Sequence, residues 1–442
     1  MAPLRPVSEL ASIIDRHTKT LENSLKGTPN AAFSLGLGAA PQIHFPGPLE
    51  ATRGELLEAL DELRARILGP VGYFMALLIP TPALLAIFHT LYAFDVASHV
   101  PLTANGEITY EELAKRCGLP EDDARRIVQA AIAFRVFEEA VPDVSVRHNA
   151  LSAALARPEM KDGLGLIVEE QTAGVAKLAE SLRRFPGSGE PGHSASVLAF
   201  REAQAVREHA SLQSELPDPS KSFFDLIAGD ERRVARFRSA MGLSTKSAAL
   251  SATHVVDNLP WADPSQCPKT IVDIGGAGGE LCQLLLRSFP AISKAVVLDL
   301  PEVVADAKAP EDLQGRLDYA SYNFLTEEVT QVADAYLFRH IFHDWSDQYS
   351  AKILRNLVPA LRKGSKIFVS EVVLPDLSDR KHTKDQRQRS ADIFMKIGFN
   401  GKERSERGWE TLVAAADPRF RIANIINPEG AHDSLIEIAF DV

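Results

Sequence analysis

The sequence predicts an α/β protein in which a doubly wound sheet of seven strands follows a mainly helical region. The first observation is a glycine-rich turn directly after an apolar strand, IVDIGGAGGELC at residues 271–282. The second is the alternation of apolar strands with helical stretches from about Pro268 onward. The third is a pattern of helix, turn, helix and hairpin between residues 109 and 154.

Length and composition are those of a globular protein. The chain has 442 residues, of which 45% are hydrophobic and 24% charged, and this excludes disordered and fibrous classes. Its net charge of −11 argues against a broad surface for nucleic acid or an anionic membrane. Three scattered cysteines are too few for a disulfide framework or a zinc cluster, and MAPLRPVSEL lacks the apolar core of a signal peptide. We therefore expect a cytoplasmic protein.

The order of segments predicts three regions. Residues 1–53 form an N-terminal arm that is rich in Pro, Gly and Ala and contains one helix, Val7 to Leu25. Residues 54–190 form a helical, winged-helix dimerisation domain, and residues 191–442 contain connecting helices and the catalytic domain. The loop Pro186 to Gly192 lies near the second boundary.

The stretch Ile67 to Val100 is strongly apolar, but prolines and polar residues interrupt it. A membrane-spanning helix needs roughly 20 mainly apolar residues in one run. We instead expect two buried helices that are broken near Pro80 and Pro82. Two such helices near an N-terminus can hardly bury this much surface within one small domain, so the sequence predicts a homodimer and no membrane partner.

The third observation describes a winged-helix module. Thr109 to Gly118 and Glu121 to Phe134 are the two helical segments, and Phe137 to Ala154 is a short hairpin that turns at Pro142-Asp143. Such modules often bind DNA through the N-terminal end of the second helix. Here that end carries Glu121, Asp122 and Asp123, which suit the helix dipole and repel phosphates. We therefore expect no nucleic-acid partner.

The alternating part of the sequence supplies the sheet. We expect its strands at residues 271–274, 295–299, 317–321, 333–338, 366–372, 421–426 and 434–440. The last two have no helix between them and are joined through Asn427 to Gly430, so the final strand should be antiparallel.

The glycine-rich turn predicts a cofactor site. Glycines allow positive φ angles and a close approach of the backbone to a ligand. Asp273 lies two residues before Gly275; a carboxylate there can accept a hydrogen bond from an ammonium group and disfavours a pyrophosphate. Asp299 ends the next strand, where a carboxylate can accept hydrogen bonds from both hydroxyls of a ribose. An ordinary turn acid at a strand end is the alternative for Asp299.

Three further segments carry a family resemblance: RHIFHDWSD at 339–347, SEVVLP at 370–375 and NGKERS at 400–405. With them, the chain resembles the plant-type and fungal small-molecule O-methyltransferases, the caffeate O-methyltransferase-like enzymes, over about residues 60–442. The resemblance implies a Rossmann-like methyltransferase domain behind an N-terminal dimerising winged-helix domain. It also implies S-adenosylmethionine as the cofactor. We expect no metal, because no further His or carboxylate lies at helical or strand spacing to complete a ligand set with His343 and Asp344.

The resemblance assigns the general base to His343. Such a base fits the chemistry, because a phenol or enol oxygen must lose its proton as it attacks the methyl carbon. Glu371 and Glu403 match the two acids that orient this base, and a carboxylate on one imidazole nitrogen fixes the tautomer. For Glu403 the alternative is a solvated loop acid within Lys402-Glu403-Arg404.

The resemblance also places the cofactor and the acceptor. Asn323 stands where the family usually has an acid, so we expect somewhat weaker cofactor binding, and Arg339 stands where the family often has Lys. The expected cofactor-binding residues are Asp273, Gly275, Gly276, Asp299, Leu300, Asn323, Phe324 and Arg339. The expected residues around a planar aromatic or polyketide-like acceptor are Met241, Asp344, Met395 and Phe399.

One residue and one charged segment receive no role in binding or catalysis. His340 points either toward the acceptor or beneath its strand, and the charged run Asp379 to Arg389 reads as a solvated loop. The function that follows is O-methylation of a phenolic or enolic secondary metabolite. The alternative is a methyltransferase-like pericyclase or dehydratase that binds the cofactor without transferring methyl. The presence of His343 with Glu371 and Glu403 favours methyl transfer.

Overall fold

The computed structural model describes residues 5–28, 33–40, 43, 45, 48–207, 218–245, 247–375 and 382–441. They form two compact units. The first contains Met1–Ala173, Ile227–Ser244 and Lys381–Thr383, and the second contains Gly174–Leu226, Thr245–Arg380 and Lys384–Val442. The predicted three regions and their boundaries stay a prediction.

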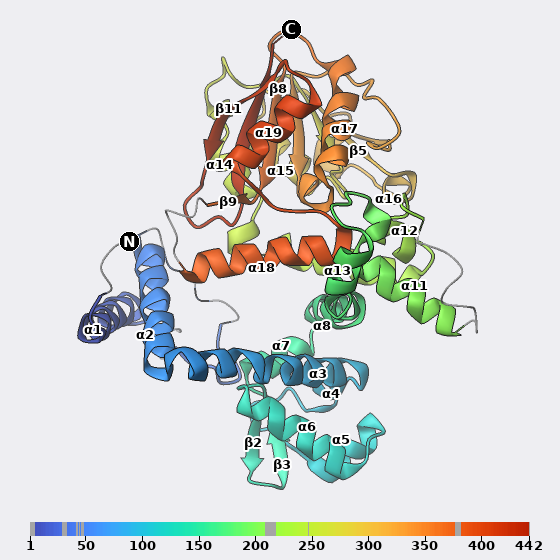
Figure 1. Cartoon of the computed structure of the whole chain (residues 1–442). Coiled ribbons are helices and arrows are strands. Elements are labelled where there is room, and N and C mark those ends of the chain that lie inside the picture. Colours follow the sequence, from blue (N-terminus) through green and yellow to red (C-terminus); the bar gives the residue numbers. More distant parts are fainter. Residues whose placement is uncertain are drawn as a thin grey trace. The chain divides into compact units, whose positions relative to one another are not determined.

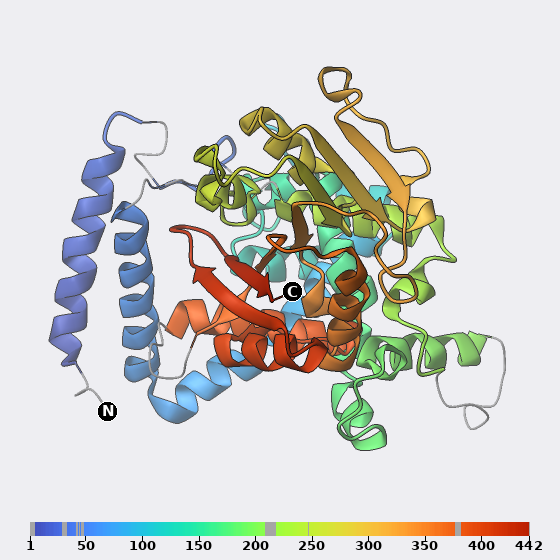
Figure 2. The ribbon, with the colours of Figure 1, turned by 90° about the horizontal axis from the view of Figure 1, so that it is seen from above.

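The first unit is mainly helical, and Figures 1 and 2 show α1 lying beside the first part of α2. Its elements are α1 (Val7–Leu25), α2 (Pro48–Leu78), α3 (Pro80–Ala93), α4 (Val96–His99), β1 (Ile108–Thr109), α5 (Tyr110–Cys117), α6 (Glu121–Ala133), β2 (Glu138–Val141), β3 (Ser145–Arg147), α7 (Ala150–Leu155), α8 (Pro158–Gly165), the π-helix η1 (Leu166–Gln171) and α13 (Glu231–Thr245). The helix α9 (Thr172–Val175) spans the boundary between the units.

The helix, turn, helix and hairpin pattern is present as α5, α6, β2 and β3. Thr109 caps α5, because its side chain accepts a hydrogen bond from the N–H of Glu112. The strand β3 pairs antiparallel with both β1 and β2. The predicted hairpin was too long at its end, since Asn149 caps a helix, α7, in a capping box with Ser152. A role for this module in dimerisation stays a prediction.

The apolar helices of this unit are broken at the predicted place, between α2 and α3. A second kink lies at Gly69, where φ is 67° and Pro70 follows. Many of their apolar side chains are exposed in the single chain; Ile67 is 71% and Val71 73% exposed. By length and composition alone, the stretch Pro48–Ala93 could cross a membrane.

The second unit contains the predicted sheet. Its strands are β4 (Thr270–Ile274), β5 (Lys294–Asp299), β6 (Leu317–Ser321), β7 (Ala335–Arg339), β8 (Lys366–Glu371), β11 (Phe420–Ile426) and β12 (Ser434–Phe440). The order across the sheet is β11-β12-β8-β7-β4-β5-β6. β4 to β8 run parallel, and β12 pairs antiparallel with β8 and with β11, as predicted.

Helices cover both faces of this sheet (Figure 1). One core contains strand residues such as Val272 and Ile274 with the helices α17 (Asp347–Leu357) and α19 (Glu406–Ala416). The other contains Ile271 and Ala295 with α14 (Thr253–Asn258) and α15 (Glu280–Ser288). Because β4 to β8 run parallel, the loops that follow them all lie at the same edge of the sheet.

The remaining elements lie wholly or mostly in the second unit and are short, except for two long helices. They are α10 (Leu178–Arg184), η2 (Pro191–His193), α11 (Ala195–Arg207), α12 (Phe223–Ile227), η3 (Ala248–Leu250), η4 (Pro260–Ala262), α16 (Pro301–Val304), η5 (Glu311–Leu313), η6 (Phe342–Asp344), η7 (Val358–Ala360), β9 (Val373–Leu374), α18 (His382–Phe399) and β10 (Arg404–Ser405). The prediction of a solvated loop at 379–389 is wrong over the residues that begin α18. From His382 onward the run is helical, with Asp385 buried and paired with Arg389; residues 379–381 lie outside the described part.

Candidate active site

The glycine turn follows β4 at the carboxyl edge of the sheet. Gly275 has a φ of 73°, and a Cβ there would lie 2.3 Å from Cδ1 of Ile341. A Cβ on Gly276 would lie 2.5 Å from Oδ2 of Asp273. Both positions therefore require glycine, one for its backbone angle and close contact and the other for close contact alone.

Asp273 lies beneath this turn. It is 2% exposed, and the thiol of Cys282 donates to its Oδ2 over 3.8 Å. Burial raises the pKa of Asp273 to about 7, although the positive charge of Arg339 acts in the opposite direction. The carboxyl group thus supports the turn from inside the protein, and its predicted contact with a ligand stays a prediction.

Asp299, at the end of β5, connects that strand to the glycine turn. Its Oδ2 accepts from the N–H of Ala277 over 2.9 Å, and its Oδ1 accepts from the N–H of Leu300 over 2.7 Å. Burial raises its pKa, although these two N–H groups oppose the shift. Each carboxylate oxygen has a second acceptor position, so Asp299 can still receive hydrogen bonds from a diol.

The loop after β6 brings two more predicted residues to this edge. The amide oxygen of Asn323 accepts from the N–H of Leu325 over 2.9 Å, which closes a local turn. The ring of Phe324 lies edge-on to Trp345 with centroids 5.9 Å apart. A Cβ on Gly275 would lie 3.8 Å from Cε1 of Phe324. Phe324 therefore lies against the glycine turn.

Arg339 ends β7 and is partly buried. Its Nη2 donates to the carbonyl of Leu250, and its buried Nε has no hydrogen-bond partner among the described residues. Burial lowers the pKa of Arg339, whereas Asp433, Asp273 and Glu280 raise it. An unpaired N–H in a ring of acids is a polar group that a ligand could satisfy.

The loop after β7, which we call the base loop, consists of residues 341–345 and contains η6. Nδ1 of His343 lies 3.0 Å from Oε1 of Glu403. Oε1 of Glu371 accepts from the N–H groups of Ile341 (2.9 Å) and Phe342 (2.5 Å). The two predicted acids thus act on different parts of the loop: Glu403 contacts the imidazole and Glu371 holds the backbone.

His343 lies among three carboxyl groups. Burial lowers its pKa, but Asp344, Glu403 and Glu371 together outweigh burial and raise the pKa to about 10. Burial in turn raises the pKa of Asp344 to about 6 and that of Glu371 to about 7. Ligand atoms of His343, Glu371 and Glu403 lie within 4.8 Å of one another. Two carboxylates that are far from His343 in sequence thus complete a set of three possible ligand groups, which spacing along the sequence did not predict.

Of the predicted acceptor residues, three lie in the second unit. Oδ1 of Asp344 lies 3.7 Å from Nε2 of His343. Phe399 is buried among aromatic rings, 5.2 Å from both Phe223 and Phe224. Met395 is partly buried on the same helix, α18. Met241 belongs to α13 in the first unit and is 40% exposed, and its role stays a prediction.

Three residues near the base loop were not singled out for a role by sequence reasoning. His340, which was left open, has a φ of 54°; its Nε2 lies 2.5 Å from Oδ2 of Asp433, and its ring stacks on His343 at 5.6 Å. Asp433 is far away in sequence, and no local pattern marks it. Arg404 is 2% exposed. The alternative of a solvated loop acid for Glu403 is wrong, because Glu403 and Arg404 are both buried.

Comparison with known proteins gives matches in family, sequence and fold. Residues 218–418 match the model of the O-methyltransferase domain. The chain is 30% identical to the O-methyltransferase kk1A of Curvularia clavata over 98% of this chain and 96% of that protein. Among solved structures, it is similar to OxaC in complex with SAH and oxaline (TM-score 0.73, 19% identity, 98% and 99% covered). It is also similar to a structure described as a pericyclic reaction enzyme (TM-score 0.70, 22% identity, 96% and 99% covered).

Proposed function

Because this chain belongs to the S-adenosylmethionine-dependent O-methyltransferases, we propose that it methylates a hydroxyl of a phenolic or enolic secondary metabolite with His343 as the general base. The observation that carries this proposal is the contact of 3.0 Å between Nδ1 of His343 and Glu403. It leaves Nε2 as the nitrogen that can accept a proton.

The residues at the other strand ends fit S-adenosylmethionine. When bound, this cofactor supplies a methyl group on a positively charged sulfur that is a good leaving group. The glycine turn with Asp273 beneath it and Asp299 beside it forms an acidic site with a closely approachable backbone. Such a site suits a cation with a ribose and opposes a phosphate. Asp299 would hold the ribose hydroxyls, and Phe324 would pack against the ligand.

The chain's part in the reaction is alignment and proton transfer. The bound cofactor would supply its methyl group to the acceptor oxygen, and Nε2 of His343 would take the proton that this oxygen loses. The imidazolium that results is stabilised by Glu403 and Asp344, which already favour this form. Holding O, C and S in line supplies most of the rate acceleration.

One property of His343 also favours a second function. With a pKa raised to about 10, the imidazole carries a proton at neutral pH before ligands bind. A bound sulfonium would oppose this charge and favour the neutral base. An imidazolium that persisted in the complex would instead donate a proton or a hydrogen bond. That chemistry suits dehydration or a pericyclic reaction in which the cofactor's charge acts electrostatically.

The experiment that separates the two functions measures S-adenosylhomocysteine. Purified protein is incubated with S-adenosylmethionine and a panel of phenolic polyketides and anthraquinones, in parallel with His343→Ala. Product in the parent protein and a loss of roughly 10²–10⁴-fold in the variant are expected for a general base. Acceptor consumption without S-adenosylhomocysteine would establish the second function and overturn the first.

We also propose that the protein is a cytoplasmic homodimer that buries the apolar face of α2 and α3. Val71 and Phe74 on this face are 73% and 58% exposed in one chain, and the three cysteines are free. A double charge substitution, Val71→Glu with Phe74→Glu, should yield monomers in sedimentation experiments. The control Leu102→Glu changes an equally exposed apolar residue, 58% accessible, outside these helices. An unchanged mass in the double variant would contradict this interface.

A further inference from the structure

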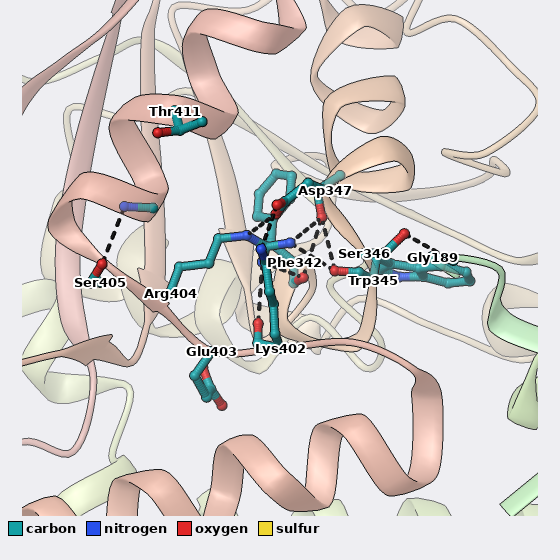
Figure 3. A network of polar contacts seen from close by, with 12 residues as sticks. Gly189, Phe342, Trp345, Ser346, Asp347, Lys402, Glu403, Arg404, Ser405 and Thr411 are labelled. Atoms are coloured by element: carbon teal, nitrogen blue, oxygen red, sulfur yellow. Dashed lines mark hydrogen bonds and ion pairs between the residues drawn. The ribbon is translucent and has the colours of Figure 1, made fainter. Parts of the chain in front are cut away.

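The guanidinium of Arg404 lies directly against the backbone of the base loop (Figure 3). Its side chain is 1% exposed. Nη1 donates to the carbonyl of Phe342 over 2.7 Å, and Nη2 donates to the carbonyl of Trp345 over 2.8 Å. These two carbonyls flank His343 and Asp344, so one planar group joins both ends of the segment that carries the base.

The remaining N–H groups of Arg404 are also satisfied. Nε donates to Oδ1 of Asp347 over 2.9 Å, Nη2 to Oγ of Ser350 over 3.0 Å and Nη1 to the carbonyl of Lys402 over 3.4 Å. The five contacts match the five N–H donors of a guanidinium. An ammonium group has three donors and no planar fork, so lysine cannot reproduce this set.

The base loop needs such outside partners. Its η6 is a 3₁₀-helix of three residues, too short to hold its own shape. Glu371 accepts from the N–H groups of Ile341 and Phe342 at the start of the loop. Arg404 donates to carbonyls at both ends of η6. The carboxylate of Glu371 thus holds N–H groups of this short segment, and the guanidinium of Arg404 holds its carbonyl groups.

Arg404 also follows Glu403, which contacts the imidazole. Figure 3 shows the side chain of Glu403 pointing away from that of Arg404. The segment is held in place because β10 pairs with β9, with Arg404 opposite Val373. The N–H of Lys402 donates to the carbonyl of His343 over 2.9 Å. One segment thus positions both the backbone and the ring of the base.

We propose that Arg404 is a positioning residue that sets the orientation of His343 toward the acceptor oxygen by clamping the carbonyls of Phe342 and Trp345. This proposal rests on the proposed role of His343 as general base. Arg404 itself touches neither substrate nor cofactor in this scheme. Displacing a base by about 1 Å can reduce a rate by 10²-fold, so a loosened loop has a measurable effect.

The test is Arg404→Lys, which keeps the charge and loses the fork. We expect kcat to fall at least about tenfold, while the KM for S-adenosylmethionine and the affinity for S-adenosylhomocysteine stay within about twofold. The midpoint of the pH profile should also move to lower pH, because a displaced imidazole loses its contact with Glu403. A merely structural arginine would lower the melting temperature and leave kcat and the pH midpoint of the folded enzyme unchanged, and that result would overturn the proposal.

The matched control is Arg419→Lys. Arg419 forms an ion pair with Asp417 at 2.8 Å and lies over the ring of Phe440, and no contact with the base loop is among its described interactions. The variant Arg419→Lys should leave kcat and the midpoint of the pH profile unchanged. Should Arg404→Lys fail to fold, Ser350→Ala removes one acceptor of Nη2 together with the hydroxyl's own hydrogen bonds to the carbonyls of Phe342 and Trp345, and a decrease of kcat in the same direction is expected. Unchanged kcat and pH midpoint in Ser350→Ala would then overturn the proposal.

A second readout does not depend on methyl transfer. The titration of His343 is followed by NMR of the imidazole Cε1–H group in the parent protein and in Arg404→Lys. A lower midpoint in the variant supports the clamp even if no acceptor is methylated, in which case only the proposed function fails. Equal midpoints in both proteins would contradict the clamp even if methyl transfer is found.

Discussion

The glycine turn and the base loop lie at the same edge of the sheet but are held by different forces. The turn after β4 is shaped by backbone angles and close packing; Gly275 has a φ of 73° and leaves no room for a Cβ beside Ile341. The base loop after β7 is held by charged side chains, Glu371 on its N–H groups and Arg404 on its carbonyls. The first region should therefore be sensitive to shape and the second to charge and pH.

The largest effect should come from adding one methyl group to the turn. In Gly275→Ala the new Cβ lies 2.3 Å from Cδ1 of Ile341, and an L-residue is strained at this φ. Either the turn or the base loop must move. We expect the affinity for S-adenosylhomocysteine, measured by calorimetry, to fall by about 100-fold or more, which corresponds to roughly 2.7 kcal/mol or more.

The control for this substitution is Gly364→Ala. Gly364 also has a positive φ, 92°, but no atom lies within 4 Å of its ideal Cβ. It carries the same kind of backbone strain in the turn before β8, and its cofactor affinity should equal that of the parent protein. Equal losses in both variants would mean that general destabilisation, and not the shape of the glycine turn, lowers the affinity.

The second effect concerns charge in the base loop. In Glu403→Gln the imidazole of His343 loses a carboxylate partner that raises its pKa. A base acts in its unprotonated form, so activity rises with pH through the pKa of the base. The parent protein should gain kcat/KM with pH into the alkaline range, and the variant's midpoint should move to lower pH, with kcat lowered about 10- to 100-fold.

The control here is Glu410→Gln. Glu410 is an exposed acid on α19, a few residues further along the chain. Both substitutions remove one negative charge, but only Glu403→Gln removes a charge that contacts the imidazole. A midpoint that shifts equally in both variants would show that net charge and not the local contact sets the titration.

The same contrast explains which parts of the molecule could be predicted from sequence. All seven strands of the sheet and the helix Val7–Leu25 were predicted with small errors at their ends, because apolar periodicity and turn residues are local signals. Asp299 lies at the end of its strand, as predicted, and it reaches the glycine turn because neighbouring parallel strands end at one edge.

The base loop depends on residues that are far apart in sequence. His343, Glu371, Glu403 and Arg404 come together only through tertiary packing, and only the family resemblance indicated three of them. The clamp by Arg404 was missed because a charged run normally predicts a solvated face, whereas here burial is balanced by five hydrogen-bond donors meeting acceptors. For the same reason, the first residues of α18 were predicted to belong to a solvated loop.

The smallest effect should come from Asn323, where the cofactor side departs from the family pattern. Its amide oxygen accepts from the N–H of Leu325 and closes the turn after β6. Aspartate keeps the size and this acceptor, and it adds a negative charge that strengthens hydrogen bonds from a ligand's amino group. We expect Asn323→Asp to bind S-adenosylmethionine about two- to fivefold more tightly, with kcat unchanged, because the described hydrogen bonds of Asn323 are confined to its own turn. Weaker binding in Asn323→Asp, measured by calorimetry, would show that the amide's own N–H donors are used. In that case the region around the glycine turn would depend on hydrogen-bond polarity as well as on shape.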